Sequence, residues 1–333
     1  MSAAPPHPRD VFDLMGGQET EAAFLAALDR GRLHHAWLLT GPEGVGKATF
    51  AYRAARRLLG AAPDAAYGPL GASPDDPVSR QIAARAHPDL LVLQREAEDG
   101  KPRKSIPVDE ARALPEFFSK SPASAPYRVA IIDAADDLNV NAANAVLKTL
   151  EEPPPRGVLL LVSHSPGGLL ATLRSRCRRL RFEAPPAEAV AAWVADRAQV
   201  TPAAATRLLA MARGAVGRAW RLADAGALEI DDQAHELLRS LPRLDDSAML
   251  VIAEKFRGAE GQARFEMLFD RLADQIHHMA ASQATSGVGE GRDLDRWAQA
   301  HEMLTLMPRE AEALNLDRAD SFFTALARLR AIA

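Results

Sequence analysis

Residues 41–49 read GPEGVGKAT, a combination that could bind the phosphates of a nucleotide. In the pattern GxxxxGK[ST], glycines let backbone N–H groups surround an anion, the lysine reaches the terminal phosphates, and the last hydroxyl binds Mg²⁺. The residues that fit, with one further glycine inside the loop, are Gly41, Gly44, Gly46 and Lys47. Ala48 holds the hydroxyl position, and Thr49 comes one residue late, about 100° further around a helix. The loop is therefore expected to hold a polyphosphate while lacking one ligand of the metal.

A second candidate residue, Asp133, ends the apolar run VAIID. A carboxylate in this place is expected where a Walker B aspartate holds Mg²⁺, and the alternative is a buried strand whose aspartate caps a helix. The next residue of hydrolytic ATPases is usually a glutamate that polarises water, but here it is Ala134, which cannot take a proton. Asp136 and Asp137 are interpreted as surface or capping acids. Together with Ala48, this loss indicates weak or absent hydrolysis.

Residues 159–182 could contribute two further functions. Ser163 follows an apolar run, where it could sense a γ-phosphate or serve only as a turn residue. A dense arginine run follows it, made of Arg174, Arg176, Arg178, Arg179 and Arg181. Such a run is usually a solvated face, but an arginine at the end of a rigid element can also reach a neighbouring subunit's γ-phosphate. Arg176 is the candidate for that role.

The sequence predicts no metal site. Cys177 is the single cysteine, so an intrachain disulfide and a multi-cysteine cluster are excluded. A packed thiol is favoured there over a thiol with a lowered pKa. The adjacent pairs His34–His35 and His277–His278 are expected to point to different faces, which disfavours shared ligation.

The elements that must position these residues alternate between apolar runs and helical patterns, which is typical of a mostly parallel α/β sheet. Strands are expected at 36–39, 90–93, 128–132 and 158–162. Helices are expected at 47–59, 108–119 and 140–150, the last stopped by prolines. The glycine loop would then lie between a strand and a helix, the setting that phosphate binding requires.

Three domains are predicted: an α/β nucleotide-binding-like domain at 1–184, a helical lid at 185–228 and a helical bundle at 229–333. In the lid, Thr201 and Pro202 form an N-cap and first helical position, and Gly214 is expected to stop a helix. Residues 284–291, ATSGVGEG, are predicted to be a loop of the bundle.

Composition limits the classes of function. The chain has 333 residues and a net charge of −4, so no global positive field would draw it to nucleic acid or to an anionic membrane. No uncharged apolar run is long enough to span a bilayer. A cytoplasmic protein without a membrane partner is therefore expected.

Three strings, GPEGVGKAT, VAIIDAADDLNVNAANAVLKTLEEPP and LLATLRSRC, together resemble the delta-prime family of bacterial DNA polymerase III clamp-loader subunits, which are AAA+ proteins. LKTLEEPP and SRC are the specific part, and the likeness covers about residues 15–225. The resemblance implies an AAA+ domain, a helical lid and a collar domain. It also implies that delta and gamma/tau subunits, the sliding clamp (beta) and primed DNA are partners.

The resemblance also carries roles for single residues. It implies that Arg176, the arginine of SRC, projects into the ATP site of a neighbouring gamma or tau subunit, and that the chain itself is a poor ATPase. Many family members carry a four-cysteine zinc module, but about Gly60–Pro88 there is no cysteine, so no zinc is expected. A lid arginine that senses nucleotide corresponds by position to Arg218.

The favoured function is thus a clamp-loader subunit that binds ATP without efficient hydrolysis. The alternative is a catalytically active AAA+ ATPase, gamma/tau-like or helicase-loader-like. A direct DNA-binding regulator is a third class, for which only the arginine run offers phosphate contacts.

Overall fold

The computed structural model describes residues 6–95, 97–98, 101–103, 105–183, 185–243, 245–286 and 291–331. The chain divides into two compact units, Met1–Asp224 and Ala225–Ala333. The finer division predicted from the sequence, with a separate lid at 185–228, stays a prediction. Its bounds at residues 1, 184 and 333 lie outside the described residues.

The first unit contains a parallel five-stranded sheet with the strand order β2-β5-β6-β1-β7. Its strands are β1 (Ala36–Thr40), β2 (Leu90–Gln94), β5 (Arg128–Asp133), β6 (Gly157–Ser163) and β7 (Arg178–Arg181). A separate antiparallel pair consists of β3 (Ala97–Glu98) and β4 (Lys101–Pro102). Parallel neighbours require crossover connections, which here run through helices. The predicted α/β fold with a mostly parallel sheet is confirmed.

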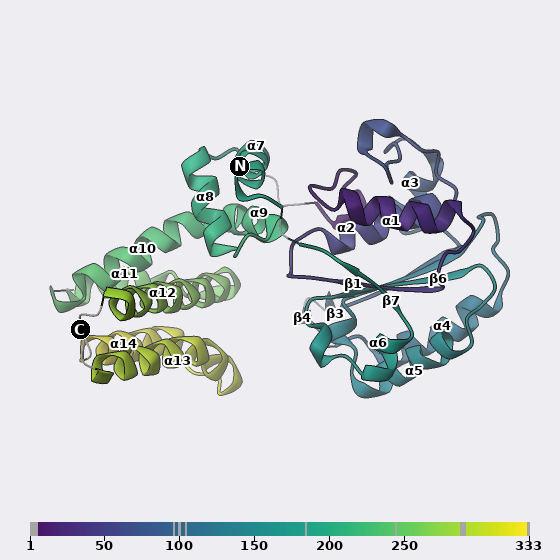
Figure 1. The fold of residues 1–333 in the computed structure, drawn as a ribbon. Coiled ribbons are helices and arrows are strands. Elements are labelled where there is room, and N and C mark those ends of the chain that lie inside the picture. The colour runs from purple at the N-terminus through teal and green to yellow at the C-terminus, as the bar shows by residue number, and fades with distance from the viewer. Residues whose placement is uncertain are drawn as a thin grey trace. The chain divides into compact units, whose positions relative to one another are not determined.

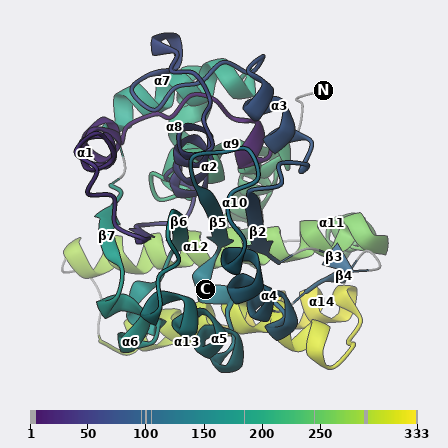
Figure 2. The ribbon, with the colours of Figure 1, turned by 90° about the vertical axis from the view of Figure 1, so that its right-hand side faces the viewer.

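Helices cover both faces of this sheet, α1 to α3 on one and α4 to α6 on the other (Figure 1), and a view turned by 90° shows the same two layers (Figure 2). They are α1 (Gln18–Asp29), α2 (Lys47–Leu58), α3 (Pro77–Ala83), α4 (Val108–Ser119), α5 (Val140–Glu151) and α6 (Ala171–Ser175). Side chains alternate along a strand, so in β5 Ile131 packs into the core under α2 and Ile132 into the core under α5. The sheet therefore has a hydrophobic core on each face.

Strand β7 was not predicted, because three of its four residues are arginines. It lies at an edge of the sheet, where one buried side chain, Leu180, is enough to attach it. Two of its arginines are used locally. The Arg178 guanidinium lies 5.0 Å from the centre of the Trp37 ring, and Arg179 Nε donates to Thr40 Oγ1 at 2.9 Å.

The helices α7 (Ala187–Ala198), α8 (Pro202–Met211) and α9 (Val216–Asp224) complete the first unit. Thr201 Oγ1 accepts from the Ala204 N–H at 3.2 Å with Pro202 as the first helical residue, as predicted. Gly214, with φ +78°, follows the end of α8. Short 3₁₀ helices are η1 (Pro8–Asp10), η2 (Ala65–Tyr67), η3 (Ala135–Asp137) and η4 (Pro166–Gly168).

The second unit is helical. Its elements are α10 (Ala227–Ser240), η5 (Leu241–Arg243), α11 (Asp246–Glu254), α12 (Gly258–Ser286), α13 (Gly291–Ala313) and α14 (Arg318–Arg330). Phe256 packs edge-on against both Phe265 and Phe322 in its core. Of the predicted loop at 284–291, residues 284–286 are helical and residue 291 begins α13, while 287–290 lie outside the described residues. Among the described helices, none has the length and apolarity needed to cross a membrane.

Candidate functional site

The glycine loop connects β1 to α2, which begins at Lys47. Its glycines have positive φ: Gly41 at +148°, Gly44 at +77° and Gly46 at +91°. Each also lies where a side chain would collide with another element. A Cβ on Gly44 would lie 2.9 Å from the backbone N of Arg218, at the start of α9. The loop conformation therefore needs glycine both for its φ angles and for its packing.

Lys47 is almost fully buried, with 2% of its surface exposed. Its Nζ donates to the carbonyl of Gly41 at 2.7 Å and also to that of Pro42. Burial lowers the pKa of Lys47 to about 8, although Asp136, Asp133 and Glu43 act to raise it. The loop's own carbonyls thus take the hydrogen bonds that phosphate oxygens would accept.

Asp133 lies at the end of β5, and it lines the same cavity as Lys47. Burial raises the pKa of Asp133 to about 6, while Lys47 acts to lower it. The next residue, Ala134, is buried and does not line this cavity, and its methyl group could not take a proton. Ala48 and Thr49, in the first turn of α2, also line the cavity. The site offers a cation and a carboxylate, and at positions 48 and 134 no group that could bind metal or activate water.

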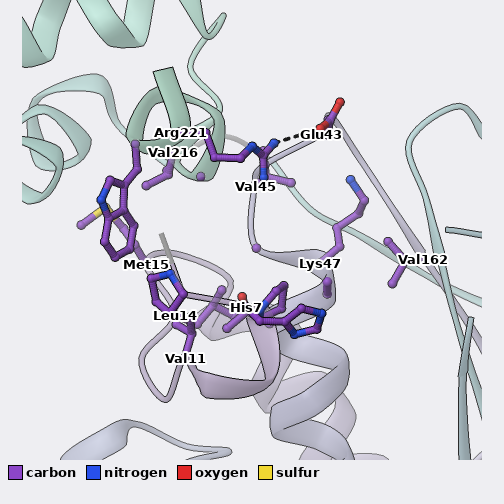
Figure 3. Close-up of a pocket in the computed structure, with 18 of the residues that line it drawn as sticks. His7, Val11, Leu14, Met15, Glu43, Val45, Lys47, Val162, Val216 and Arg221 are labelled. Carbon is purple, nitrogen blue, oxygen red and sulfur yellow. Dashed lines mark hydrogen bonds and ion pairs between the residues drawn. The ribbon is translucent and has the colours of Figure 1, made fainter. Parts of the chain in front are cut away.

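The cavity around these residues has a volume of 360 Å³, within the usual range for small-molecule sites. Its walls come from the N-terminal segment 6–15, the glycine loop with the start of α2, the ends of β5 and β6, and the helices α7 and α9. Figure 3 shows Val11, Leu14 and Met15 on the N-terminal side, Lys47 in the loop, and Arg221 from α9. The cavity therefore has a polar end at the loop and an apolar end, as a phosphorylated ligand with an apolar ring would require.

Buried arginines of α2 hold the N-terminal segment in place. Arg53 pairs with Glu21 at 2.7 Å and donates to the carbonyl of Phe12. The Arg56 guanidinium lies 4.1 Å from the centre of the Phe12 ring and also donates to the carbonyl of Arg9. These contacts explain how a segment whose one regular element is the short helix η1 makes one wall of the cavity. No motif in the sequence predicts this wall.

Helices α7 and α9 close another side through three contacts. The Gly217 N–H donates to the carbonyl of Gly44 at 2.9 Å. Arg221 pairs with Glu43 at 2.9 Å, and Arg197 of α7 pairs with Asp13 at 2.6 Å. Two of these contacts are made by the glycine loop itself.

Ser163 and Arg218, two predicted nucleotide contacts, stay predictions, and their surroundings are as follows. Ser163 Oγ donates to Asp136 Oδ1 at 3.0 Å, and Asp136 also accepts from the His164 N–H at 2.7 Å. Asp136 is thus a capping acid of the loop after β6, as predicted, and Ser163 is bound to it. The cavity is lined by Gly217 and Arg221 rather than by Arg218.

Arg176 follows α6 and lies outside the cavity of its own chain. Its Nη1 donates to the carbonyl of Thr172 at 2.9 Å, and its Nη2 lies 3.0 Å from Glu151 Oε1. About a third of the side chain, 36%, is exposed. For the neighbouring Cys177, burial raises the pKa of the thiol to about 12, so the alternative of an activated thiol is wrong.

Within the described residues, no group of three or more His, Cys, Asp or Glu side chains could hold a metal ion. The imidazoles of His34 and His35 stack with centres 4.4 Å apart, so the expectation that they face apart is wrong.

Comparisons with known proteins agree on a family. The profile of the family described as "DNA polymerase III, delta subunit" matches residues 17–186. DNA polymerase III subunit delta' of Pseudomonas aeruginosa is 38% identical over 246 residues, 74% of this chain and 71% of that protein. The Escherichia coli protein of the same name is 30% identical, with 79% and 76% covered. DNA polymerase III subunit tau of Bacillus subtilis is 25% identical over 85% of this chain and 46% of that protein.

Among solved structures, a DNA polymerase III gamma subunit-related protein from Thermotoga maritima matches with a TM-score of 0.47 at 18% identity, covering 92% of this chain and 99% of that one. The family match and the delta' relatives decide the assignment: the chain belongs to the DNA polymerase III delta-prime subunit family.

Proposed function

We propose that this chain is a clamp-loader subunit that helps place the sliding clamp on primed DNA and lends Arg176 to an ATPase subunit beside it. Its own hydrolysis of ATP would be weak or absent, so that it acts as a component of the DNA polymerase III assembly. One observation carries this proposal. Lys47 and Asp133 share a cavity in which position 48 is alanine, the residue after Asp133 is also alanine, and Arg176 lies outside that cavity.

The position of Arg176 suits action on another subunit. Its contacts with Thr172 and Glu151 are made by the guanidinium group, and about a third of the side chain remains exposed. A guanidinium supplied by a neighbour offsets the charge that develops on a transferring γ-phosphoryl group. Glu151 would have to release Arg176 for this, which an exposed ion pair allows at small cost.

The proposed partners follow from this role. They are the gamma/tau and delta subunits, with the sliding clamp (beta) and primed DNA reached through the assembly, since the net charge of −4 gives the chain no general attraction to DNA. The proposed ligand of the cavity is ATP, without zinc. Lys47, Thr49 and the glycines of the loop would hold the phosphates, and Asp133 would face the metal that accompanies them.

Reconstitution with gamma or tau and delta subunits tests the proposal. The change Arg176→Ala should leave the chain folded and lower DNA-stimulated turnover at the neighbouring site about 10³-fold. Arg181→Ala is the matched control, because Arg181 is also an exposed arginine in an ion pair, 3.4 Å from Glu183. Equal turnover for wild type and Arg176→Ala would remove Arg176 from the mechanism.

An active ATPase is the second candidate, favoured by the presence of Lys47 and Asp133 in one cavity. It requires steady turnover by the isolated chain that is lost in Lys47→Ala. If the isolated chain shows no such turnover and Arg176→Ala lowers turnover of the assembly, the first candidate is supported.

A further inference from the structure

The polar end of the cavity contains two cations, and the glycine loop itself supplies the partners of both. Lys47 is bound by the carbonyls of Gly41 and Pro42. Arg221 is bound by the carboxylate of Glu43. It lies one turn along α9 from Gly217, whose N–H donates to the loop. Both Glu43 and Arg221 line the cavity, and Figure 3 shows their contact above Lys47. A phosphorylated ligand would need the same two cations.

Glu43 therefore does two things that matter for such a ligand. Its ion pair with Arg221 lies beside the hydrogen bond from Gly217 to Gly44, so both contacts attach α9 to the loop. Its negative charge also lies at the wall that a polyphosphate would approach, where like charges repel. The side chains of Arg221 and Glu43 are 53% and 59% exposed, so a ligand can reach Arg221 and replace Glu43 as its partner.

We propose that Glu43 is an internal substitute for phosphate: it holds Arg221 and keeps α9 on the loop without a ligand, and a nucleoside di- or triphosphate must displace it to bind. Arg221 then becomes the residue of α9 that receives a phosphate, in place of Arg218, which does not line the cavity. This inference rests on the nucleotide-binding part of the proposed function and does not involve Arg176.

The first test uses the isolated full chain without ligand. Glu43→Gln removes the charge of the side chain and keeps its shape. Backbone hydrogen exchange across residues 216–221 should then become about threefold faster, because one exposed ion pair contributes that much to local stability. Arg221→Gln should give the same increase, and the double variant no more than either. Glu183→Gln is the control, since it removes an equal charge at an exposed pair outside the cavity. Unchanged exchange in Glu43→Gln would overturn the proposal.

The second test titrates the same variants with a fluorescent ADP analogue and Mg²⁺. Glu43→Gln should bind about tenfold more tightly than wild type, because repulsion is removed and Arg221 is released. Arg221→Gln should bind more weakly, and adding Glu43→Gln to it should restore only part of the gain. Equal or weaker binding by Glu43→Gln, or no binding by any variant, would refute the phosphate-substitute role. If both tests succeed but turnover by the reconstituted gamma or tau and delta subunits is the same with wild type and with Arg176→Ala, the proposed function alone is refuted.

Discussion

Replacing Asp89 by alanine should strongly destabilise the first unit, because Asp89 is a buried carboxylate that holds a loop together. Asp89 precedes β2, and its carboxylate is fully buried. It accepts backbone N–H bonds from Ala123 at 2.8 and 3.0 Å, Ser124 at 3.0 Å and Ala125 at 3.2 Å. Arg128, at the start of β5, lies 3.4 Å away. One side chain thus fixes the loop that leads into the strand carrying Asp133.

The expected loss follows from the groups that would be left behind. Alanine would remove the anion that binds three inward-facing N–H groups and the Arg128 guanidinium. Only 10% of the Arg128 side chain is exposed, so water could not replace that anion well. Unpairing a buried charge and its hydrogen bonds costs roughly 3–5 kcal/mol. For a unit of this size, such a loss lowers the melting temperature by about 10 °C.

Differential scanning calorimetry would measure this shift, with Asp75→Ala as the control. Asp75 also pairs with an arginine, Arg80 at 2.9 Å, but 87% of its side chain is exposed, so its loss should cost less than about 1 kcal/mol. Burial acts to raise the pKa of Asp89, but the three N–H groups and Arg128 outweigh it and hold the pKa below its usual value. The stabilisation is therefore complete above about pH 4 and is lost as pH falls further, through the folded-state pKa. A fall of less than about 3 °C at pH 7 would refute this account.

Two further predictions concern the cavity. Gly44→Ala should lower the free energy of unfolding by about 1–2 kcal/mol and speed hydrogen exchange of the Gly217 amide, because a Cβ would lie 2.9 Å from the Arg218 N. Gly31→Ala is the control, since Gly31 has φ +62° and nothing within 4 Å, so that it adds backbone strain alone. An equal effect of both changes would exclude the steric cause. Because burial lowers the pKa of Lys47 to about 8 and a bound polyphosphate would raise it, nucleotide binding at pH 8 should take up about half a proton and weaken as pH rises to about 9. Calorimetric titrations in two buffers of different ionisation enthalpy measure that uptake, and identical heats would contradict it.

The parts of the fold that could be predicted are those with a local signal. Strand β5 is a run of apolar residues, and α8 begins with Thr201 and Pro202, so hydrophobicity and capping define them without tertiary context. Strand β7 has no such signal. Its arginines are compatible with a strand only because the edge of the sheet exposes Arg178 and Arg181 and supplies Trp37 as a partner.

The same distinction applies to the site. The glycine loop and Asp133 were recognisable because spacing within the sequence defines them. The cavity's other walls depend on contacts between distant segments, such as Arg53 with Phe12 and Arg221 with Glu43. No local pattern in the sequence predicts those pairs. Arg221 in particular could be distinguished from Arg218 only after the direction of α9 relative to the loop was known.

The residues of the glycine loop do not all argue equally for a phosphate ligand. Gly41 and Gly44 are required by packing, against the Phe182 carbonyl and the Arg218 N, and Gly46 by its φ of +91°, so a purely structural loop would need them too. Lys47 is different, because burial disfavours its charge and the two carbonyls that bind it carry no charge of their own. A buried apolar side chain would fill the same space without that cost. Lys47 is therefore the residue of the loop that an anionic ligand explains and packing does not.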